Sequence, residues 1–256
     1  MTDKQRSPRD RFLTVYGRKP VLEALGDPEL TVDKVVLAET ARGEPVRTIR
    51  AAARERGVPV HSASEHRVKV LAGNGKQDQG VLADVLAPRM RPLAEALEPG
   101  NGRLGPVLLL DGITTPANVG MILRTATAAG LAGIVVPHKG VASLDPLVVK
   151  ASAGIAFHAP ILRAPTAADA AEQLSEAGYR LFGLASDGPE GLFEAGFPDR
   201  VAFVLGGETS GVSTAVRAHI GDWLSIPMPG AAESLNVSAA AAVLCFELVR
   251  RDHTGG

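Results

Sequence analysis

The chain has 256 residues, of which 45% are hydrophobic, 21% are charged and 4% are aromatic, and its formal net charge at pH 7 is -1. This length is enough for two modest domains with ordinary hydrophobic cores. The single cysteine, Cys245, excludes an internal disulfide and a zinc–cysteine cluster, and no apolar run approaches the roughly 18 residues that a membrane span needs.

Positive charge is concentrated at the beginning of the chain. Up to Leu104 there are 18 basic and 14 acidic residues, and after it there are 9 and 14. Basic residues are densest between Lys4 and Lys19, which is typical both of a solvated, disordered tail and of an arm that contacts phosphate groups. We expect residues 1–14 to be a basic flexible tail. Because this start lacks the apolar core of a signal peptide, we also expect a cytoplasmic protein.

The next part of the chain has the pattern of a small α/β domain, which we place at residues 15–87. Helices are predicted over residues 17–25, 45–56 and 65–71, and strands over residues 34–37, 58–60 and 80–86. From Pro88 to Pro106 there are four prolines and three glycines among polar residues. This composition predicts a linker at residues 88–105 and a second domain at residues 106–256.

Three segments of the second domain share one pattern, in which a short apolar strand is followed by a polar loop and a helix. The strands are predicted at residues 107–110 and 201–205 and at a run that ends at Ile226, the loops at residues 111–120, 206–211 and 227–236, and the helices from residues 121, 213 and 239. In open α/β sheets, ligands bind where loops follow the carboxyl ends of strands. The three loops therefore predict one ligand site.

The last loop contains two prolines, which keep it out of regular helix and of central strands. Ser234 and Asn236 then precede an apolar helix, in which Cys245 is expected to be a small core residue. Either polar residue could simply cap that helix, and this interpretation suffices for the segment taken alone. The repetition of the pattern in the other two segments favours a ligand site.

The three segments resemble the three motifs of the SpoU (TrmH-type) family of RNA ribose 2′-O-methyltransferases, in the SPOUT superfamily. The residues that carry the resemblance are Asp111-Gly112, Pro116, Asn118, Gly120, Ile122, Arg124, Thr125 and Ala129-Gly130 in the first motif, Leu205-Gly206, Glu208 and Gly211 in the second, and Ile226-Pro227-Met228 with Glu233 to Ser238 in the third. The resemblance spans residues 105–250, and Leu144-Asp145, Lys150 and Gly154 resemble the family's connecting segment. The chain departs from the family pattern at Thr115, Ala117 and Ser210.

The resemblance implies an α/β fold in which the second domain is a SPOUT domain with a deep trefoil knot. The segments 15–25 and 79–85 are similar to the N-terminal substrate-binding domain of many SpoU enzymes, which implies an L30e-like RNA-binding domain at residues 15–87. A homodimer, with the site completed across the interface, is also implied. The sequence does not fit a Rossmann methyltransferase, because no G-x-G-x-x-G motif follows the strand that ends at Leu110.

S-adenosylmethionine is the implied methyl donor, and no metal is implied. The implied catalytic residues are Arg124, Asn118, Glu208, Ser234 and Asn236, and the implied cofactor-binding residues are Leu205, Gly206, Gly207, Gly211, Ile226, Met228, Leu235, Asn236 and Ser238. A guanidinium has a pKa above about 12, so we expect Arg124 to clamp the target phosphate and stabilise the alkoxide rather than act as the base. Arg18 and Lys19 are RNA-binding candidates, although a solvated surface role explains them equally well.

The extra N-terminal domain favours 23S ribosomal RNA as the substrate. Two alternatives stay open, a transfer RNA ribose methyltransferase and a non-catalytic RNA-binding protein on the same fold. The presence of Asn118, Arg124, Glu208, Ser234 and Asn236 together argues against the second alternative. The resemblance also allows a role in antibiotic resistance, through modification of a drug site on the ribosome.

Overall fold

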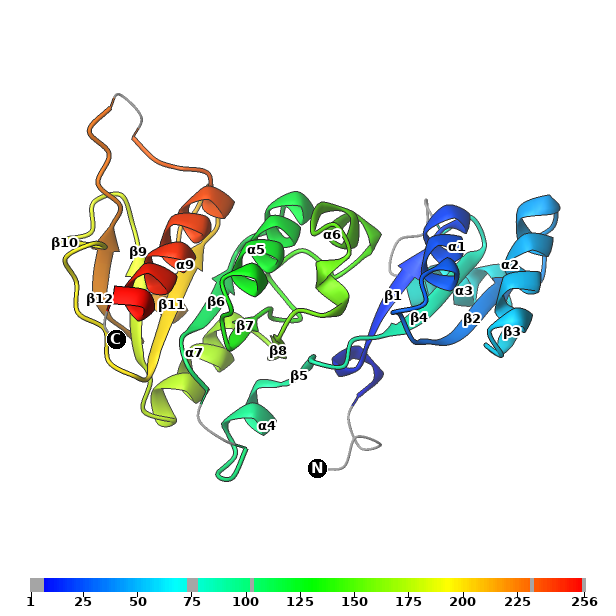
Figure 1. Ribbon diagram of the computed structural model, residues 1–256, viewed down its shortest axis with the longest axis horizontal. Coiled ribbons are helices and arrows are strands. Elements are labelled where there is room, and N and C mark those ends of the chain that lie inside the picture. Colours follow the sequence, from blue (N-terminus) through cyan, green and yellow to red (C-terminus); the bar gives the residue numbers. More distant parts are fainter. Residues whose placement is uncertain (1–6, 73–77, 102–103, 231–232, 255–256) are drawn as a thin grey trace.

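The computed structural model describes residues 7–72, 78–101, 104–230 and 233–254, and it contains two β-sheets with their covering helices (Figure 1). This is the predicted α/β class, with a small N-terminal unit and a larger parallel sheet. The trefoil knot that the resemblance implies stays a prediction. No helix of the described residues is both long and apolar enough to cross a membrane.

The N-terminal sheet has four strands in the order β1-β4-β2-β3. The strands are β1 (Phe12–Tyr16), β2 (Val32–Ala38), β3 (Val60–Ala63) and β4 (Val81–Leu86), and the helices are α1 (Arg18–Gly26), α2 (Glu44–Glu55) and α3 (Glu65–Ala72). Strand β4 is antiparallel to β1 and β2, and β3 is parallel to β2. Each element predicted for residues 15–87 has a counterpart, but the strand predicted over residues 58–60 is shifted to β3 and shares only Val60 with it. Helix α2 could be predicted because Val46, Ile49 and Ala53 repeat at helical spacing, and these residues are buried.

The predicted tail, residues 1–14, differs from the structure in its last part. After a short 3₁₀ turn, η2 (Pro8–Asp10), the chain enters β1 and pairs with β4 from Phe12 onward. Leu13 and Val15 alternate with half-buried residues and are both 2% exposed. The prediction of a tail rested on the many basic residues of this segment and did not consider the alternation of apolar residues. Residues 1–6 lie outside the described residues.

The second sheet has eight strands in the order β10-β12-β9-β11-β6-β7-β8-β5, and every pairing in it is parallel. The strands are β5 (Arg91–Pro92), β6 (Val107–Asp111), β7 (Gly133–Val135), β8 (Ile161–Arg163), β9 (Arg180–Leu184), β10 (Glu190–Gly191), β11 (Val201–Gly206) and β12 (Ile220–Ser225). The helices are α4 (Leu93–Leu97), α5 (Pro116–Ala128), α6 (Pro146–Ala151), η3 (Ile155–Phe157), α7 (Ala167–Glu176), α8 (Thr214–Arg217) and α9 (Val237–Thr254).

The central strands of this sheet are covered on both faces. Leu108 and Leu110 belong to the hydrophobic cluster that includes α5 and α9, whereas Val107 and Leu109 belong to the cluster that includes α7. A strand that is buried on both faces has no polar alternation, which explains the continuous apolar run in the sequence.

The segment predicted as a linker, residues 88–105, contributes a strand to this sheet and a helix to its covering layer. Strand β5 pairs with β8, and α4 follows directly. Leu93 and Ala96 of α4 are at most 1% exposed and pack in the same cluster as α7. Proline and glycine dominate the segment's composition, but a two-residue strand and one helical turn suffice to anchor it.

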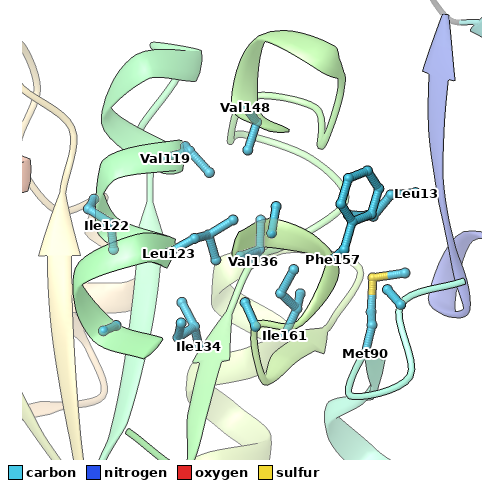
Figure 2. Close-up of a cluster of buried hydrophobic side chains, with 14 of the residues drawn as sticks. Leu13, Met90, Val119, Ile122, Leu123, Ile134, Val136, Val148, Phe157 and Ile161 are labelled. Carbon is cyan, nitrogen blue, oxygen red and sulfur yellow. The ribbon is translucent and has the colours of Figure 1, made fainter. Parts of the chain in front are cut away.

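The two sheets are joined by apolar and polar contacts. Figure 2 shows Leu13 and Met90 beside Phe157, and all three belong to one buried cluster. The hydroxyl of Tyr16 in β1 donates a hydrogen bond to Oδ2 of Asp145, 3.0 Å away, at the start of α6. The N-terminal sheet therefore rests on the layer formed by α6 and η3.

Candidate functional site

The loops that follow β6 and β11 touch through their backbones. Asp111, at the end of β6, is 7% exposed, and its Oδ2 accepts a hydrogen bond from the backbone N of Ser213 at 2.7 Å. A Cβ atom on Gly207 would lie 2.4 Å from the carbonyl oxygen of Gly112. Within the loop after β11, a Cβ atom on Gly206 would lie equally close to the carbonyl carbon of Gly211, and the contact with Gly112 is the one that joins the two loops. Only glycine permits this approach of the two loops.

Three polar side chains from the three predicted loops meet at one carboxylate oxygen. Oε1 of Glu208 accepts hydrogen bonds from Nδ2 of Asn118 at 2.8 Å and from Nδ2 of Asn236 at 2.6 Å. The Asn236 amide also lies 3.2 Å from Oδ1 of Asn118. Asn118 is 3% exposed, whereas Glu208 and Asn236 are exposed. The structure therefore brings these three predicted residues together, and one of them, Asn118, is buried.

Asn236 also caps the last helix. Its Oδ1 accepts hydrogen bonds from the backbone N of Ser238 at 2.9 Å and from the Ser238 hydroxyl at 2.6 Å, and its carbonyl accepts from Ala240 N at 3.0 Å. The helix cap and the contact with Glu208 are thus made by opposite ends of one side-chain amide. The two interpretations that the sequence left open for this residue are compatible.

A cavity of about 430 Å³ lies beside this network, at the carboxyl ends of β9, β11 and β12. The predicted residues that line it are Leu205, Gly206, Gly207, Glu208, Gly211, Ile226, Met228, Ser234, Leu235 and Asn236. Ser238 was predicted to contact the cofactor but does not line the cavity, because its hydroxyl is turned to Asn236. Glu233 does not belong to the described lining.

Other lining residues were missed in the sequence. They are Leu184, the last residue of β9, and Ala185, Ser186 and Asp187 after it, so β9 is a fourth strand with a polar loop at its carboxyl end. The same strand-and-loop pattern could have identified them. Arg217 and Trp223 also line the cavity, and neither lies in a loop that the pattern marks.

Besides Asn118 and Ser238, the predicted residues that do not line the cavity are Arg124, Arg18 and Lys19. Arg124 is exposed on α5, whose first turn carries Asn118. Arg18 and Lys19 begin α1 in the N-terminal unit, far along the molecule from the cavity strands β9 and β12 (Figure 1). The backbone N of Arg18 donates to the side chain of Gln79 at 3.2 Å, and Lys19 lies 3.7 Å from Glu23.

The remaining chemistry-bearing groups of the described residues suggest no second centre. No three His, Cys, Asp or Glu side chains among them are grouped to hold a metal ion. Cys245 is buried in α9, and burial raises the pKa of its thiol to about 12. A thiol with that pKa stays protonated at neutral pH and is a poor nucleophile.

Comparison with known proteins gives a consistent family. Residues 105–246 match the SpoU rRNA Methylase family, and residues 14–91 match a family described as RNA 2'-O ribose methyltransferase substrate binding. The 23S rRNA (guanosine-2'-O-)-methyltransferase RlmB of Xanthomonas axonopodis pv. citri is 32% identical over 240 residues, which are 93% of this chain and 96% of that protein.

Solved structures agree with the sequence relatives. The SpoU methyltransferase AviRb from Streptomyces viridochromogenes, in complex with the cofactor AdoMet, is 26% identical, covers 99% of this chain and 95% of that one, and superposes with a TM-score of 0.62. A structure described as giving insights into the 2-OH methylation of C/U34 on tRNA is 30% identical, covers 60% of this chain and 100% of that one, and has a TM-score of 0.52. This chain therefore belongs to the SpoU rRNA methylase family.

Proposed function

We propose that this protein transfers a methyl group from S-adenosylmethionine to a ribose 2′-hydroxyl of 23S ribosomal RNA. The observation that carries the proposal is the convergence of Asn118, Glu208 and Asn236 from three loops beside one cavity. Similarity to a 23S rRNA guanosine methyltransferase over nearly the whole chain supports the choice of RNA.

The cavity fits the cofactor in size and chemistry. Its volume of about 430 Å³ lies within the roughly 300–1,000 Å³ of small-molecule sites. Backbone groups of Gly206 and Gly207 form part of the wall, and Ile226 and Met228 supply apolar surface. Such a wall suits an adenine ring, which needs flat apolar contacts and a few fixed hydrogen-bonding groups. Bound S-adenosylmethionine supplies an electrophilic methyl group.

The protein's own side chains then position the nucleophile and manage its proton. Both amide hydrogen bonds engage Oε1 of Glu208, so Oε2 is available to accept a hydrogen bond from the ribose hydroxyl. The two amides fix the carboxylate before the substrate arrives, which reduces the cost of orientation. We assign Arg124 to the phosphate beside the target ribose, because a guanidinium fork suits phosphate oxygens. Ser234, at the cavity wall, is assigned to the substrate as well.

A homodimer is part of the proposal. Helices α5 and α9 lie side by side and carry Met121 and Phe246, which are 40% and 52% exposed (Figure 1). Contiguous exposed apolar surface marks protein contact sites, and we assign these two side chains to such a surface. Because Arg124 lies on the same α5, pairing through these helices would bring it close to the interface. Light scattering of the wild type and of Phe246→Glu tests this. A monomeric mass for the wild type would contradict the dimer, and a dimeric mass for Phe246→Glu would contradict this interface.

The test of the function is methyl transfer to defined RNA. Purified protein is incubated in EDTA with tritiated S-adenosylmethionine and either 23S rRNA or total tRNA, and labelled positions are mapped. We expect label in 23S rRNA on a ribose oxygen, no requirement for a metal ion, and loss of label with Glu208→Gln. Cofactor binding without transfer to any RNA would favour the non-catalytic alternative.

Transfer RNA is the second candidate substrate. The observation that favours it is the 30% identity to the protein of the tRNA methylation structure, which matches over its whole length. That match covers only 60% of this chain. Label confined to tRNA would replace the first proposal with this one.

A further inference from the structure

The described lining of the cavity contains one positively charged side chain. Among the described residues that line the cavity, Arg217 is the only basic one, and Asp187 and Glu208 are the acidic ones. We propose that Arg217 binds the carboxylate of the methionine portion of the cofactor. This inference rests on the proposed function, since it assigns one more residue to the same ligand.

The Arg217 guanidinium is held on two sides. Its Nε donates a hydrogen bond to the backbone carbonyl of Val212 at 3.0 Å, and its Cζ lies 4.5 Å from the ring centroid of Trp223. Stacking on an indole fixes the plane of a guanidinium and adds a cation–π attraction. The side chain is therefore oriented before any ligand binds.

The platform beneath the guanidinium is itself fixed. Trp223 lies on β12 directly opposite Gly183 of β9. A Cβ atom at Gly183 would lie 2.6 Å from the Trp223 ring, so the ring occupies the space that any larger residue would fill. A tryptophan that packs on glycine backbone has little room to change its rotamer. The platform for Arg217, at the end of α8, is thus built on two adjacent strands rather than on a loop.

Apart from its stacking on Trp223, the charge of Arg217 has no partner among the described residues. Within the described residues no carboxylate forms an ion pair with it, and its one hydrogen bond engages Nε. Arg180 and Arg251, by contrast, are paired with Asp222 and Glu247. The two Nη groups of Arg217 are left for a ligand. A guanidinium presenting two N–H groups matches a carboxylate in a bidentate arrangement.

The charges of the ligand select its carboxylate as the partner. S-adenosylmethionine carries a sulfonium, an ammonium and one carboxylate, and its adenosine portion is neutral. The single cation of the wall suits the single anion of the ligand, and the two acidic residues suit its positive groups. The alternative is a purely structural role, in which Arg217 only ties Val212 to Trp223.

These two roles predict different ligand dependence. A structural role affects every ligand of the cavity, whereas a carboxylate contact affects only ligands that carry the carboxylate. S-adenosylhomocysteine and its decarboxylated analogue, S-(5′-adenosyl)-3-thiopropylamine, differ in that group alone. Their affinities are measured by calorimetry, with displacement titration for the weaker ligand. The proteins are the wild type, Arg217→Met, Arg217→Lys and the control Arg200→Met. Arg200 is also exposed and donates to a backbone carbonyl, but it does not line the cavity.

We expect the wild type to prefer S-adenosylhomocysteine by about 10-fold or more, as a charge-assisted hydrogen bond would give. Arg217→Met should lose that preference by weakening S-adenosylhomocysteine alone, Arg217→Lys should keep part of it, and Arg200→Met should keep all of it. An equal loss for both ligands, or no preference in the wild type, overturns the inference and leaves the proposed function intact. Failure of the wild type to bind either ligand overturns the proposed function.

Discussion

At the scale of single residues, Arg124 differs from the predicted residues that line the cavity. It lies on α5, outside the lining. We therefore predict that Arg124→Ala lowers the rate of methyl transfer by about 100-fold or more, as the loss of a transition-state donor does. Cofactor affinity should stay within about twofold, a difference of only a few tenths of a kcal/mol.

Single-turnover kinetics and calorimetry on the same preparation check both parts. Arg54→Ala, at the end of the distant helix α2, is a matched control that should change neither quantity. If Arg124→Ala bound the cofactor poorly and its rate loss followed from that, the assignment of Arg124 to the RNA would be wrong.

Glu247 on α9 gives a pH prediction. Hydrogen bonds from Arg250, and then from Arg251, outweigh the effect of burial and lower the pKa of its carboxyl from 4.5 to about 2. A depressed folded-state pKa stabilises the fold above the unfolded value, and this contribution is lost as the pH falls from 4.5 toward 2. Glu247→Gln lacks this carboxylate.

Urea unfolding at several pH values tests the contribution of Glu247. The variant should be less stable than the wild type at pH 7, and the difference in the free energy of unfolding should shrink progressively between pH 4.5 and pH 2. A difference that stayed constant down to pH 2 would show that packing, rather than charge, accounts for the effect of the substitution.

At the scale of elements, α5 and α6 are held together at a glycine. A Cβ atom on Gly120 would lie 2.5 Å from the Cβ of Ala151 and 2.7 Å from the carbonyl oxygen of Val148. Gly120→Ala must push the helices apart, and overpacking of this kind costs about 1–3 kcal/mol. We predict a lower melting temperature and a slower methyl transfer, because Asn118 lies on the same helix.

A matched control exists in α1. Gly26 is also a helical glycine without positive φ, and a Cβ atom there would meet nothing within 4 Å. Gly26→Ala should leave the melting temperature unchanged or raise it slightly, as alanine does in helices. Equal melting temperatures for the two variants would show that α5 and α6 accommodate the added methyl group without loss of stability.

Elements with strong local signals could be predicted, and those made by distant contacts could not. The runs at Val107 and Val201 are apolar throughout, so β6 and β11 could be read from the sequence together with the loops that follow. Strand β5 has two residues, and it exists because it pairs with β8 about seventy residues later. The same reason applies to the site, where the loop residue Asn236 was predictable and the strand residue Trp223 was not.

At the scale of the whole molecule, we propose a division near Pro88 rather than near Leu104, because Leu93 and Ala96 pack in the core of the second sheet. A protein of residues 88–256 should fold and bind the cofactor, with a lower melting temperature because Leu13 no longer covers Phe157. A protein of residues 104–256 should be less stable again, since each lost large apolar side chain contributes roughly 1.5–3 kcal/mol.

Thermal unfolding and calorimetry of both truncated proteins test this division. Equal stability of the two would contradict the structural role of α4. Both should lose most affinity for rRNA, because the basic excess lies in the removed part, and the affinity of the full chain should fall steeply with salt. Filter binding at two salt concentrations measures this, and full affinity in residues 88–256 would show that the second unit alone recognises RNA.

The position of Asn236 near the end of the chain has a consequence for protein synthesis. The carboxylate of Glu208 acquires its second amide partner only after about nine-tenths of the polypeptide has been made. A polypeptide terminated early, or clipped before α9, would carry the N-terminal unit without the completed site. On the proposed function it would occupy RNA without modifying it, so such fragments would act as inhibitors of the intact enzyme in the same cell.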